Sequence, residues 1–472
     1  MTAVVVIGGG IAGLAAAREL ALAGVGDITV LESGPRWGGK LAPVVLDGVR
    51  LDSGAESVLA RRPEAVGLID SLALQAQRVH PTAAKSQVLI DGSVRGLPPS
   101  AMGVPRDLEV LEGYLTPAGL SRARQEVTLP APALTGDVGI GAYVDARFGP
   151  EVTDRLLEPL LGGVYAGQAR QLSFDAVSPA LFERARHGGS LLEHASQLTA
   201  TTASGPVFAG LTGGISTLVD ALLADLSSRG VELRTGVTVR SLAPAGTGFR
   251  MLCGPVPAPE VISADAVVLA VPAAATGRLL AELSPVAGEW ATIPYASMAV
   301  VTMVLQGAEL SGSGLLVPPG QLPTVKALTY SSNKWDWVGA AAEAAWAPGT
   351  AVVRASVGRL GEERLLQLDD EALLARTFAE AGGLPGWGGA RLVTGRVTRW
   401  GGALPQYLVG HRDLVARLRG SLTGLPGVAV CGAALDGVGV AACLASAGAA
   451  AAKIVADLGG VGSLPSNRHQ DL

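Results

Sequence analysis

The sequence predicts an α/β protein, α+β over the whole chain, with one parallel sheet, one mixed sheet and a helical insertion. Near the N-terminus, the apolar run of residues 4–7 is followed by a glycine-rich turn and a segment with helical spacing. Residues 425–452 show the same order of strand, glycine-rich turn and helix. Residues 296–305, 324–331 and 351–357 are alternating or β-branched, which favours a separate mixed or antiparallel sheet.

Residues 4–32 have the pattern of a mononucleotide-binding βαβ unit. Residues 4–7 are apolar throughout, as expected of a parallel strand that is covered on both faces. Residues 11–22 are the expected helix, and residues 28–31 are the returning strand. Between the first strand and the helix lie the three glycines of a G-x-G-x-x-G motif, which permit a tight turn and a close approach to a pyrophosphate: Gly8, Gly10 and Gly13. This order predicts a Rossmann-like dinucleotide-binding domain, and the alternative is a glycine-rich turn of another α/β protein.

Glu32 stands where an acidic side chain accepts hydrogen bonds from ribose hydroxyls in dinucleotide folds. The next segment, SGPRWGGKL, contains a glycine doublet between two cations: Arg36, Gly38, Gly39 and Lys40. Small residues would let a flat ring lie against the backbone, and a cation would offset the charge of a diphosphate. The two cations could instead be solvated loop charges.

The middle of the chain, residues 108–194, is mainly helical in pattern, with a loop at residues 130–136. It contains the segment LEPLLGGVYAG, residues 157–167. Gly162 and Gly163 would allow the backbone to approach a ligand, or they could mark the stop of a helix between packed helices.

The chain is expected to form three domains and a tail. The nucleotide-binding domain is predicted to be discontinuous and to comprise residues 1–75, 206–292 and 422–460. The substrate domain is predicted to comprise residues 76–98 and 293–421, the helical insertion residues 99–205, and the flexible tail residues 461–472.

Composition excludes several classes of function. The formal net charge of −5 gives no electrostatic reason to expect nucleic-acid binding. The three cysteines are odd in number and form no C-x-x-C pair, and the five histidines show no ligand spacing, so no metal site is predicted. The N-terminus has no signal-peptide pattern, and the apolar residues 428–452 include Asp436 and many glycines. We therefore expect a cytoplasmic protein without a transmembrane segment.

Four motifs together resemble one family. They are LEPLLGGVYAG at residue 157, SSNKWDW at residue 331, ALPQYLVGH at residue 403 and VCGAALDGVGVAACLASAGAAA at residue 430. With the segment SGPRWGGKL, they resemble the protoporphyrinogen/coproporphyrinogen oxidase family of haem biosynthesis, whose members are flavoproteins of the amine-oxidase type. The resemblance spans nearly the whole chain. The sequence Ala-Arg-Arg at residues 60–62 is most similar to the soluble bacterial coproporphyrinogen III oxidases.

The resemblance implies FAD rather than NAD as the cofactor. It places Arg36 and the glycine doublet along the diphosphate and isoalloxazine, and Val239 where backbone groups hold the adenine. It also directs amides near the start of the last helix at the N1–C2=O edge of the flavin, where they would stabilise a reduced anionic ring. The residues concerned are Gly437 and Val438, and Gly432 gives the strand-turn before them its close packing. The alternative is a glycine-rich turn without a ligand.

The resemblance also implies a reaction: coproporphyrinogen III loses six electrons to FAD in successive steps, O₂ reoxidises the flavin, and H₂O₂ and coproporphyrin III are formed. Gly163 is expected to present its backbone carbonyl to a pyrrole N–H. Four propionates require cations, and the candidates are Arg62, Arg61, Lys334 and His411. Positioning would replace acid–base catalysis by side chains.

Three other functions stay open from the sequence. The same fold could oxidise protoporphyrinogen IX, which has two propionates and two vinyl groups, or it could be an amine oxidase or carotenoid-type desaturase. It could also be a flavin-free, escort-type binding protein. Whether a ferrochelatase receives the product directly is left open.

Overall fold

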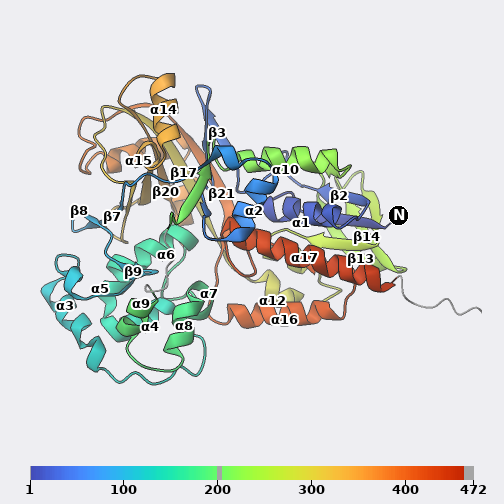
Figure 1. The fold of residues 1–472 in the computed structure, drawn as a ribbon, viewed down its shortest axis with the longest axis horizontal. Coiled ribbons are helices and arrows are strands. Elements are labelled where there is room, and N and C mark those ends of the chain that lie inside the picture. Colours follow the sequence, from blue (N-terminus) through green and yellow to red (C-terminus); the bar gives the residue numbers. More distant parts are fainter. Residues whose placement is uncertain (1, 199–204, 462–472) are drawn as a thin grey trace, which may run out of the picture.

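The computed structural model describes residues 2–198 and 205–461. It contains a parallel sheet and a larger mixed sheet that lie side by side, and a group of helices at one end of the molecule (Figure 1). Both the parallel sheet and the mixed sheet were predicted, so the α/β fold class with its helical insertion is confirmed.

The parallel sheet has five strands, and strands far apart in the sequence are neighbours in it. Their order is β12 (Glu232–Arg234), β2 (Asp27–Leu31), β1 (Ala3–Ile7), β16 (Ala266–Leu269) and β22 (Val428–Val430). All residues of β1 from Val4 onward are buried, because both faces of the strand are covered. One face is covered by α1 (Ile11–Leu22), α10 (Thr217–Ser228) and α17 (Val440–Val461).

The other face of the parallel sheet packs against a three-stranded antiparallel sheet and three helices. These elements are β13 (Val239–Ala245), β14 (Gly248–Cys253), β15 (Glu260–Ala264), α11 (Ala273–Leu279), α12 (Ala287–Ala291) and α16 (His411–Thr423). Most of α16 falls in the range predicted for the substrate domain, yet its apolar side packs with this core.

The mixed sheet has seven strands, antiparallel except where β18 pairs with β7. Their order is β21 (Arg391–Pro405), β17 (Tyr295–Gln306), β20 (Thr350–Val357), β19 (Val325–Tyr330), β18 (Gly314–Leu316), β7 (Ser86–Ile90) and β8 (Ser93–Gly96). Two layers pack against this sheet. Helix α15 (Asp370–Ala381) shares one apolar core with it. The second layer consists of α13 (Ser331–Lys334), α14 (Asp336–Ala345) and the hairpin of β3 (Pro43–Leu46) and β4 (Val49–Asp52). The hairpin lies in the range predicted for the nucleotide-binding domain but contacts this sheet.

The helical part packs around one apolar core, below the mixed sheet in Figure 1. It consists of α3 (Pro117–Arg124), α4 (Ile140–Phe148), α5 (Pro150–Val152), α6 (Glu158–Tyr165), α7 (Phe174–Val177), α8 (Pro179–Ala185) and α9 (Leu191–Gln197). Residues Thr153–Leu157, between α5 and α6, form a π-helical turn, a conformation that is frequent at functional sites. Helix α6 contacts β18 and β19, so it connects the helical part to the mixed sheet.

The shorter elements connect these parts. A three-stranded sheet joins β5 (Val58–Leu59), β11 (Phe208–Leu211) and β6 (Arg78–Val79), and α2 (Pro63–Ser71) follows β5. The remaining strands are β9 (Ser100–Ala101) and β10 (Val104–Pro105), and the 3₁₀ turns are Gln75–Gln77, Glu109–Leu111, Gln125–Thr128 and Glu363–Gln367.

Helix α17 is the one described helix that is long and apolar enough to cross a membrane, over Val440–Gly459. Half of that window is buried inside the fold, where α17 packs against α1, β16 and β22. We therefore interpret it as a core helix. It extends to Val461, one residue into the predicted tail, and the rest of the tail, residues 462–472, lies outside the described residues.

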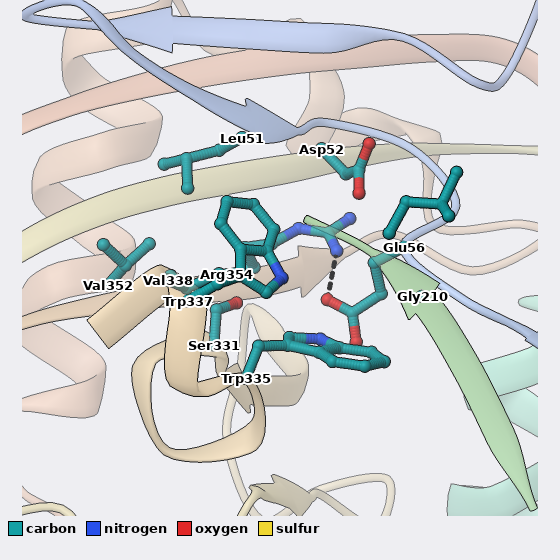
Figure 2. Close-up of a pocket in the computed structure, with 11 residues that line it drawn as sticks. Leu51, Asp52, Glu56, Gly210, Ser331, Trp335, Trp337, Val338, Val352 and Arg354 are labelled. Carbon is teal, nitrogen blue, oxygen red and sulfur yellow. Dashed lines mark hydrogen bonds and ion pairs between the residues drawn. The ribbon is translucent and has the colours of Figure 1, made fainter. Parts of the chain in front are cut away.

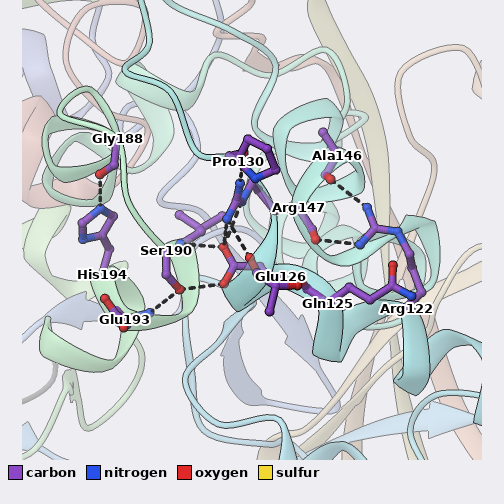
Figure 3. Close-up of polar contacts among 12 residues, drawn as sticks. Arg122, Gln125, Glu126, Pro130, Ala146, Arg147, Gly188, Ser190, Glu193 and His194 are labelled. Atoms are coloured by element: carbon purple, nitrogen blue, oxygen red, sulfur yellow. Dashed lines mark hydrogen bonds and ion pairs between the residues drawn. The ribbon is translucent and has the colours of Figure 1, made fainter.

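A buried ion pair organises the helical part (Figure 3). Glu126 is fully buried and Arg147 is 5% exposed, and their closest N···O distance is 2.6 Å. Glu126 also accepts hydrogen bonds from the hydroxyl of Ser190 at 2.6 Å and from the amide of Leu191 at 2.8 Å. The pair thus fixes the start of α9 to α4.

We expect Glu126→Gln to lower the free energy of unfolding by about 3–5 kcal/mol, because it leaves the Arg147 guanidinium buried without a counter-ion. The matched control is Glu183→Gln, which breaks an exposed pair with Arg186 and should cost less than about 1 kcal/mol. Urea unfolding followed by far-UV circular dichroism measures both variants. Equal effects would contradict a structural role for the buried pair.

Candidate functional site

The glycine turn between β1 and α1 forms an open cradle at the helix N-terminus. Gly8 has φ +112°, and a Cβ on Gly13 would lie 1.8 Å from the carbonyl oxygen of Gly8. Helix and strand can therefore pack this closely only because position 13 has no side chain. In contrast, a Cβ on Gly10, the N-cap residue, would meet no protein atom within 4 Å. The first amides of α1 have no intrahelical partner and face this open space, as an anion-binding helix end requires.

The Glu32 carboxylate lies beside this turn. It accepts hydrogen bonds from the amide of Gly9 at 2.8 Å and from the amide of Gly34 at 2.7 Å. The carboxylate therefore holds the end of β2 against the glycine turn, at the place predicted for the ribose hydroxyls. Val237 donates its amide to the Glu32 carbonyl at 2.9 Å, and this brings the start of β13, with Val239, to the same edge of the sheet.

The glycine doublet packs on the glycine turn. Gly38 donates its amide to the carbonyl of Gly9 at 2.8 Å, and a Cβ on Gly39 would lie 3.2 Å from the Cα of Gly10. Both doublet residues have positive φ, +91° and +56°, which favours glycine. The predicted doublet and the predicted fingerprint therefore form one surface.

The two cations beside the doublet differ in their surroundings. Burial lowers the pKa of Lys40, with a smaller opposing effect of Cys443 on α17. No carboxylate in residues 2–198 and 205–461 forms an ion pair with Lys40. Arg36 is exposed, lies 5.3 Å from the ring centroid of Trp400, and lines an open groove of about 430 Å³ between β3 and β21.

The C-terminal glycine-rich turn closes on the N-terminal one. Gly432 has φ +121°, and its amide donates to the hydroxyl of Ser446 on α17 at 3.0 Å. A Cβ on Gly432 would lie 4.0 Å from the Cβ of Ala12 on α1. Gly437 and Val438 lie just before the first residue of α17. The structure thus brings together the predicted residues from both ends of the chain.

These residues fit FAD. An open helix N-terminus can accept the diphosphate, Lys40 is a partly buried cation with no ion-pair partner in the described chain, and Gly39 of the doublet lies beside the N-cap glycine Gly10. Gly8, Gly10, Gly13 and Lys40 would hold the diphosphate region, and Glu32 and Val239 the adenosine part.

Gly163 lies on α6 rather than in a loop, two residues before the helix ends. Ala166 ends the helix with φ +49°, a left-handed conformation that is uncommon for a residue with a side chain. Within the described residues the carbonyl of Gly163 receives no hydrogen bond, and Gly163 is exposed. This carbonyl is therefore free to accept an N–H group.

The four candidate propionate ligands differ in exposure and in their ion-pair partners. Arg62 is partly exposed and donates two hydrogen bonds to Glu64, at 2.8 and 3.1 Å, while Arg61 is exposed. Lys334 forms an ion pair with Glu56 and faces the ring of Trp335.

His411 was wrongly predicted to be an accessible cation. Its ring is 4% exposed, stacks on Tyr407 at 4.0 Å between centroids and hydrogen-bonds to the carbonyl of Leu435 at 2.9 Å. Burial also lowers its pKa, which disfavours the charged form. The position of His411 in a family motif therefore reflects packing in this structure.

Glu56 connects the segment between β4 and β5 to the mixed sheet and was not predicted (Figure 2). Its carboxylate pairs with Lys334 and with Arg354, the latter at 2.5 Å. Burial alone would raise the pKa of Glu56, but the two cations lower it to about 2. The cavity beside this cluster measures about 20 Å³, which is room for about one water molecule and too small for a macrocycle. We therefore interpret the cluster of Glu56, Lys334 and Arg354 as a structural contact.

We predict that Gly10→Ala weakens FAD binding about tenfold or more without unfolding the protein. The added methyl group meets no protein atom, so it would obstruct only a bound diphosphate. The matched control is Gly67→Ala on α2, which also has open space and should retain FAD. Flavin absorbance after dialysis and circular dichroism measure the two effects, and full FAD retention by Gly10→Ala would place the diphosphate elsewhere.

Comparison with known proteins identifies the family. Residues 11–455 match the model of flavin containing amine oxidoreductases. Coproporphyrinogen III oxidase of Mycobacterium tuberculosis is 35% identical over 474 residues, with 95% of this chain and 96% of the relative covered. The enzyme of the same name from Bacillus subtilis is 30% identical over 467 residues, with 93% and 95% covered.

A crystal structure of a protein from Exiguobacterium sp. superimposes with a TM-score of 0.83 and 29% identity, covering 97% of this chain and 99% of the other. These matches confirm the predicted resemblance and FAD as the cofactor. The chain therefore belongs to the flavin-containing amine oxidoreductase family.

Proposed function

We propose that this protein oxidises coproporphyrinogen III to coproporphyrin III with FAD and O₂, releasing H₂O₂. The structural observation that carries the proposal is that Gly163, an exposed residue near the end of α6, has a backbone carbonyl without a hydrogen-bond donor in the described residues. A porphyrinogen is a macrocycle with pyrrole N–H donors near its centre, so one fixed acceptor can hold it. The relatives named coproporphyrinogen III oxidase support this substrate.

Bound FAD would supply the redox chemistry: it would take one hydride, which carries two electrons, from a meso carbon in each of three steps, and O₂ would reoxidise it. Six electrons leave the substrate, so one H₂O₂ forms for every two electrons. The protein binds and orients the macrocycle, which is the source of catalysis when no side chain needs to move a proton. Gly163 would accept a pyrrole N–H, while Arg62 and Arg61 would bind propionates at the rim.

The experiment is to add each reduced porphyrinogen to the FAD-loaded protein and follow porphyrin fluorescence. We expect faster oxidation of coproporphyrinogen III. Equal or faster oxidation of protoporphyrinogen IX would favour the two-propionate substrate, and a colourless protein without oxidase activity would favour the escort-type alternative. A cytoplasmic location stays a prediction.

Arg62→Ala should raise KM for coproporphyrinogen about tenfold while leaving the FAD content unchanged, because a charge-assisted hydrogen bond to a carboxylate contributes about 1.5–3 kcal/mol. Glu64→Gln provides an opposite test: it removes the carboxylate that occupies Arg62 and should lower KM. Steady-state kinetics of both variants measure the change. Unchanged KM in Arg62→Ala would exclude it as a propionate ligand.

A further inference from the structure

Lys326 is a buried lysine that the proposed mechanism does not use. It lies on β19 and is 2% exposed. The register of β19 with β20 shifts between Val325 and Ala327, so Lys326 is the extra residue of a β-bulge. Bulges turn a side chain out of the regular alternation of a strand, and they are frequent next to active sites.

The amino group of Lys326 points at the end of α6. Its Nζ lies 3.4 Å from the carbonyl oxygen of Gly162, which also accepts the amide of Ala166 at 3.0 Å. No carboxylate within 2–198 or 205–461 forms an ion pair with Lys326. A cation at the C-terminal end of a helix is favoured by the helix dipole, so a carbonyl can partly replace the missing counter-ion.

Two further contacts hold the same helix end. The side-chain amide of Gln406 donates to the carbonyl of Tyr165 at 2.8 Å, and the amide of Leu360 donates to the carbonyl of Ala166 at 2.8 Å. Lys326, Gln406 and Leu360 thus occupy the carbonyls on both sides of Gly163. They leave its carbonyl as an open acceptor.

We propose that Lys326 is a positioning residue: it fixes the last turn of α6 through Gly162 and thereby sets the direction of the Gly163 carbonyl toward the substrate. This inference rests on the proposed function, because it assigns the role of Lys326 through the pyrrole acceptor of that site.

The surroundings of Lys326 make this contact sensitive to pH. Burial lowers its pKa to about 7, with a further decrease from Arg359 and an opposing effect of Glu362. Charged groups also lie on the helices packed against β19. Helix α6 carries Glu158, near Arg359, and α15 carries the ion pair of Arg376 and Glu380, both of which hydrogen-bond to Thr324. The ammonium form donates a stronger hydrogen bond than the neutral amine. Positioning should therefore weaken as pH rises through about 7.

The test compares Lys326→Met and Lys326→Gln with wild type, with FAD bound, from pH 6 to 8.5. Lys326→Met has similar length and no donor, and Lys326→Gln keeps a donor without a charge. The matched control is Lys85→Met, an exposed lysine before β7. We measure KM and kcat for coproporphyrinogen III, FAD content, and the affinity for coproporphyrin III by fluorescence.

At pH 6 we expect Lys326→Met to raise KM and the coproporphyrin Kd by up to about tenfold, because it weakens the neutral hydrogen bond between the Gly163 carbonyl and a pyrrole N–H, with kcat and FAD content within about twofold. The wild-type KM should rise above pH 7, whereas that of Lys326→Met should change less over this range. Lys326→Gln should fall between the two, and Lys85→Met should behave as wild type.

A changed melting temperature with unchanged KM and Kd in Lys326→Met and Lys326→Gln would show a purely structural lysine and overturn the inference. If wild-type protein oxidises the substrate but the variants keep its pH profile, only the role of Lys326 fails. If wild-type protein neither oxidises coproporphyrinogen nor binds coproporphyrin, the proposed function fails first, and the inference fails with it.

Discussion

The fold depends on the contact between α1 and β1. A methyl group at Gly13 would lie 1.8 Å from the Gly8 oxygen, so the helix can pack at this depth only with glycine there. This depth places the N-terminus of α1 over the end of the parallel sheet, and it brings α1 against α17, the other end of the chain. The doublet at Gly38 and Gly39 then packs on the same turn. One close backbone approach therefore determines where the helix N-terminus, the doublet and the closing turn meet.

Two kinds of charged side chain in the interior of this protein have different meanings. Glu126 with Arg147, and Glu56 with Lys334 and Arg354, are paired, and each cluster joins segments that are distant in the sequence. Paired burial can be neutral in energy, because the attraction between the charges offsets their desolvation. Such clusters specify how parts of the chain pack.

Lys326 is buried and Lys40 is partly buried, and neither has a carboxylate partner in the described ranges, so the protein bears a desolvation cost for each charge. Lys40 lies where a diphosphate would supply the missing charge, and Lys326 lies under the helix end that bears Gly163. The unpaired lysines therefore mark the two sides of the site, the cofactor side and the substrate side.

The sequence predicted the parts of the fold that depend on local pattern. The helix expected at residues 11–22 has those limits, and β1 and β2 each begin one residue before their predicted ranges and end where predicted, because their apolar runs and flanking glycines are local signals. Strand β21 was missed, since its segment contains several arginines and glycines and only a few buried residues. Its strand conformation comes from pairing with β17, which is a long-range interaction.

In the site, too, the sequence predicts what depends on local pattern and not what depends on long-range contacts. The role of a glycine can be inferred from the sequence, because a tight turn or a close backbone approach excludes other residues. The predicted glycines do lie close together in the structure. The role of a cation cannot be inferred from the sequence in the same way. Arg62 and His411 are equally good candidates until their hydrogen-bond partners, Glu64 and the Leu435 carbonyl, are known. Lys326 offered one local signal, a single charge inside the apolar segment TVKALTY, but an exposed strand face would give the same pattern. Only the bulge in β19, which depends on pairing with β20, directs this lysine at α6. A polar residue that interrupts an apolar strand is thus a reason to look for a register shift, and the register shift decides whether the residue faces solvent or a functional backbone group.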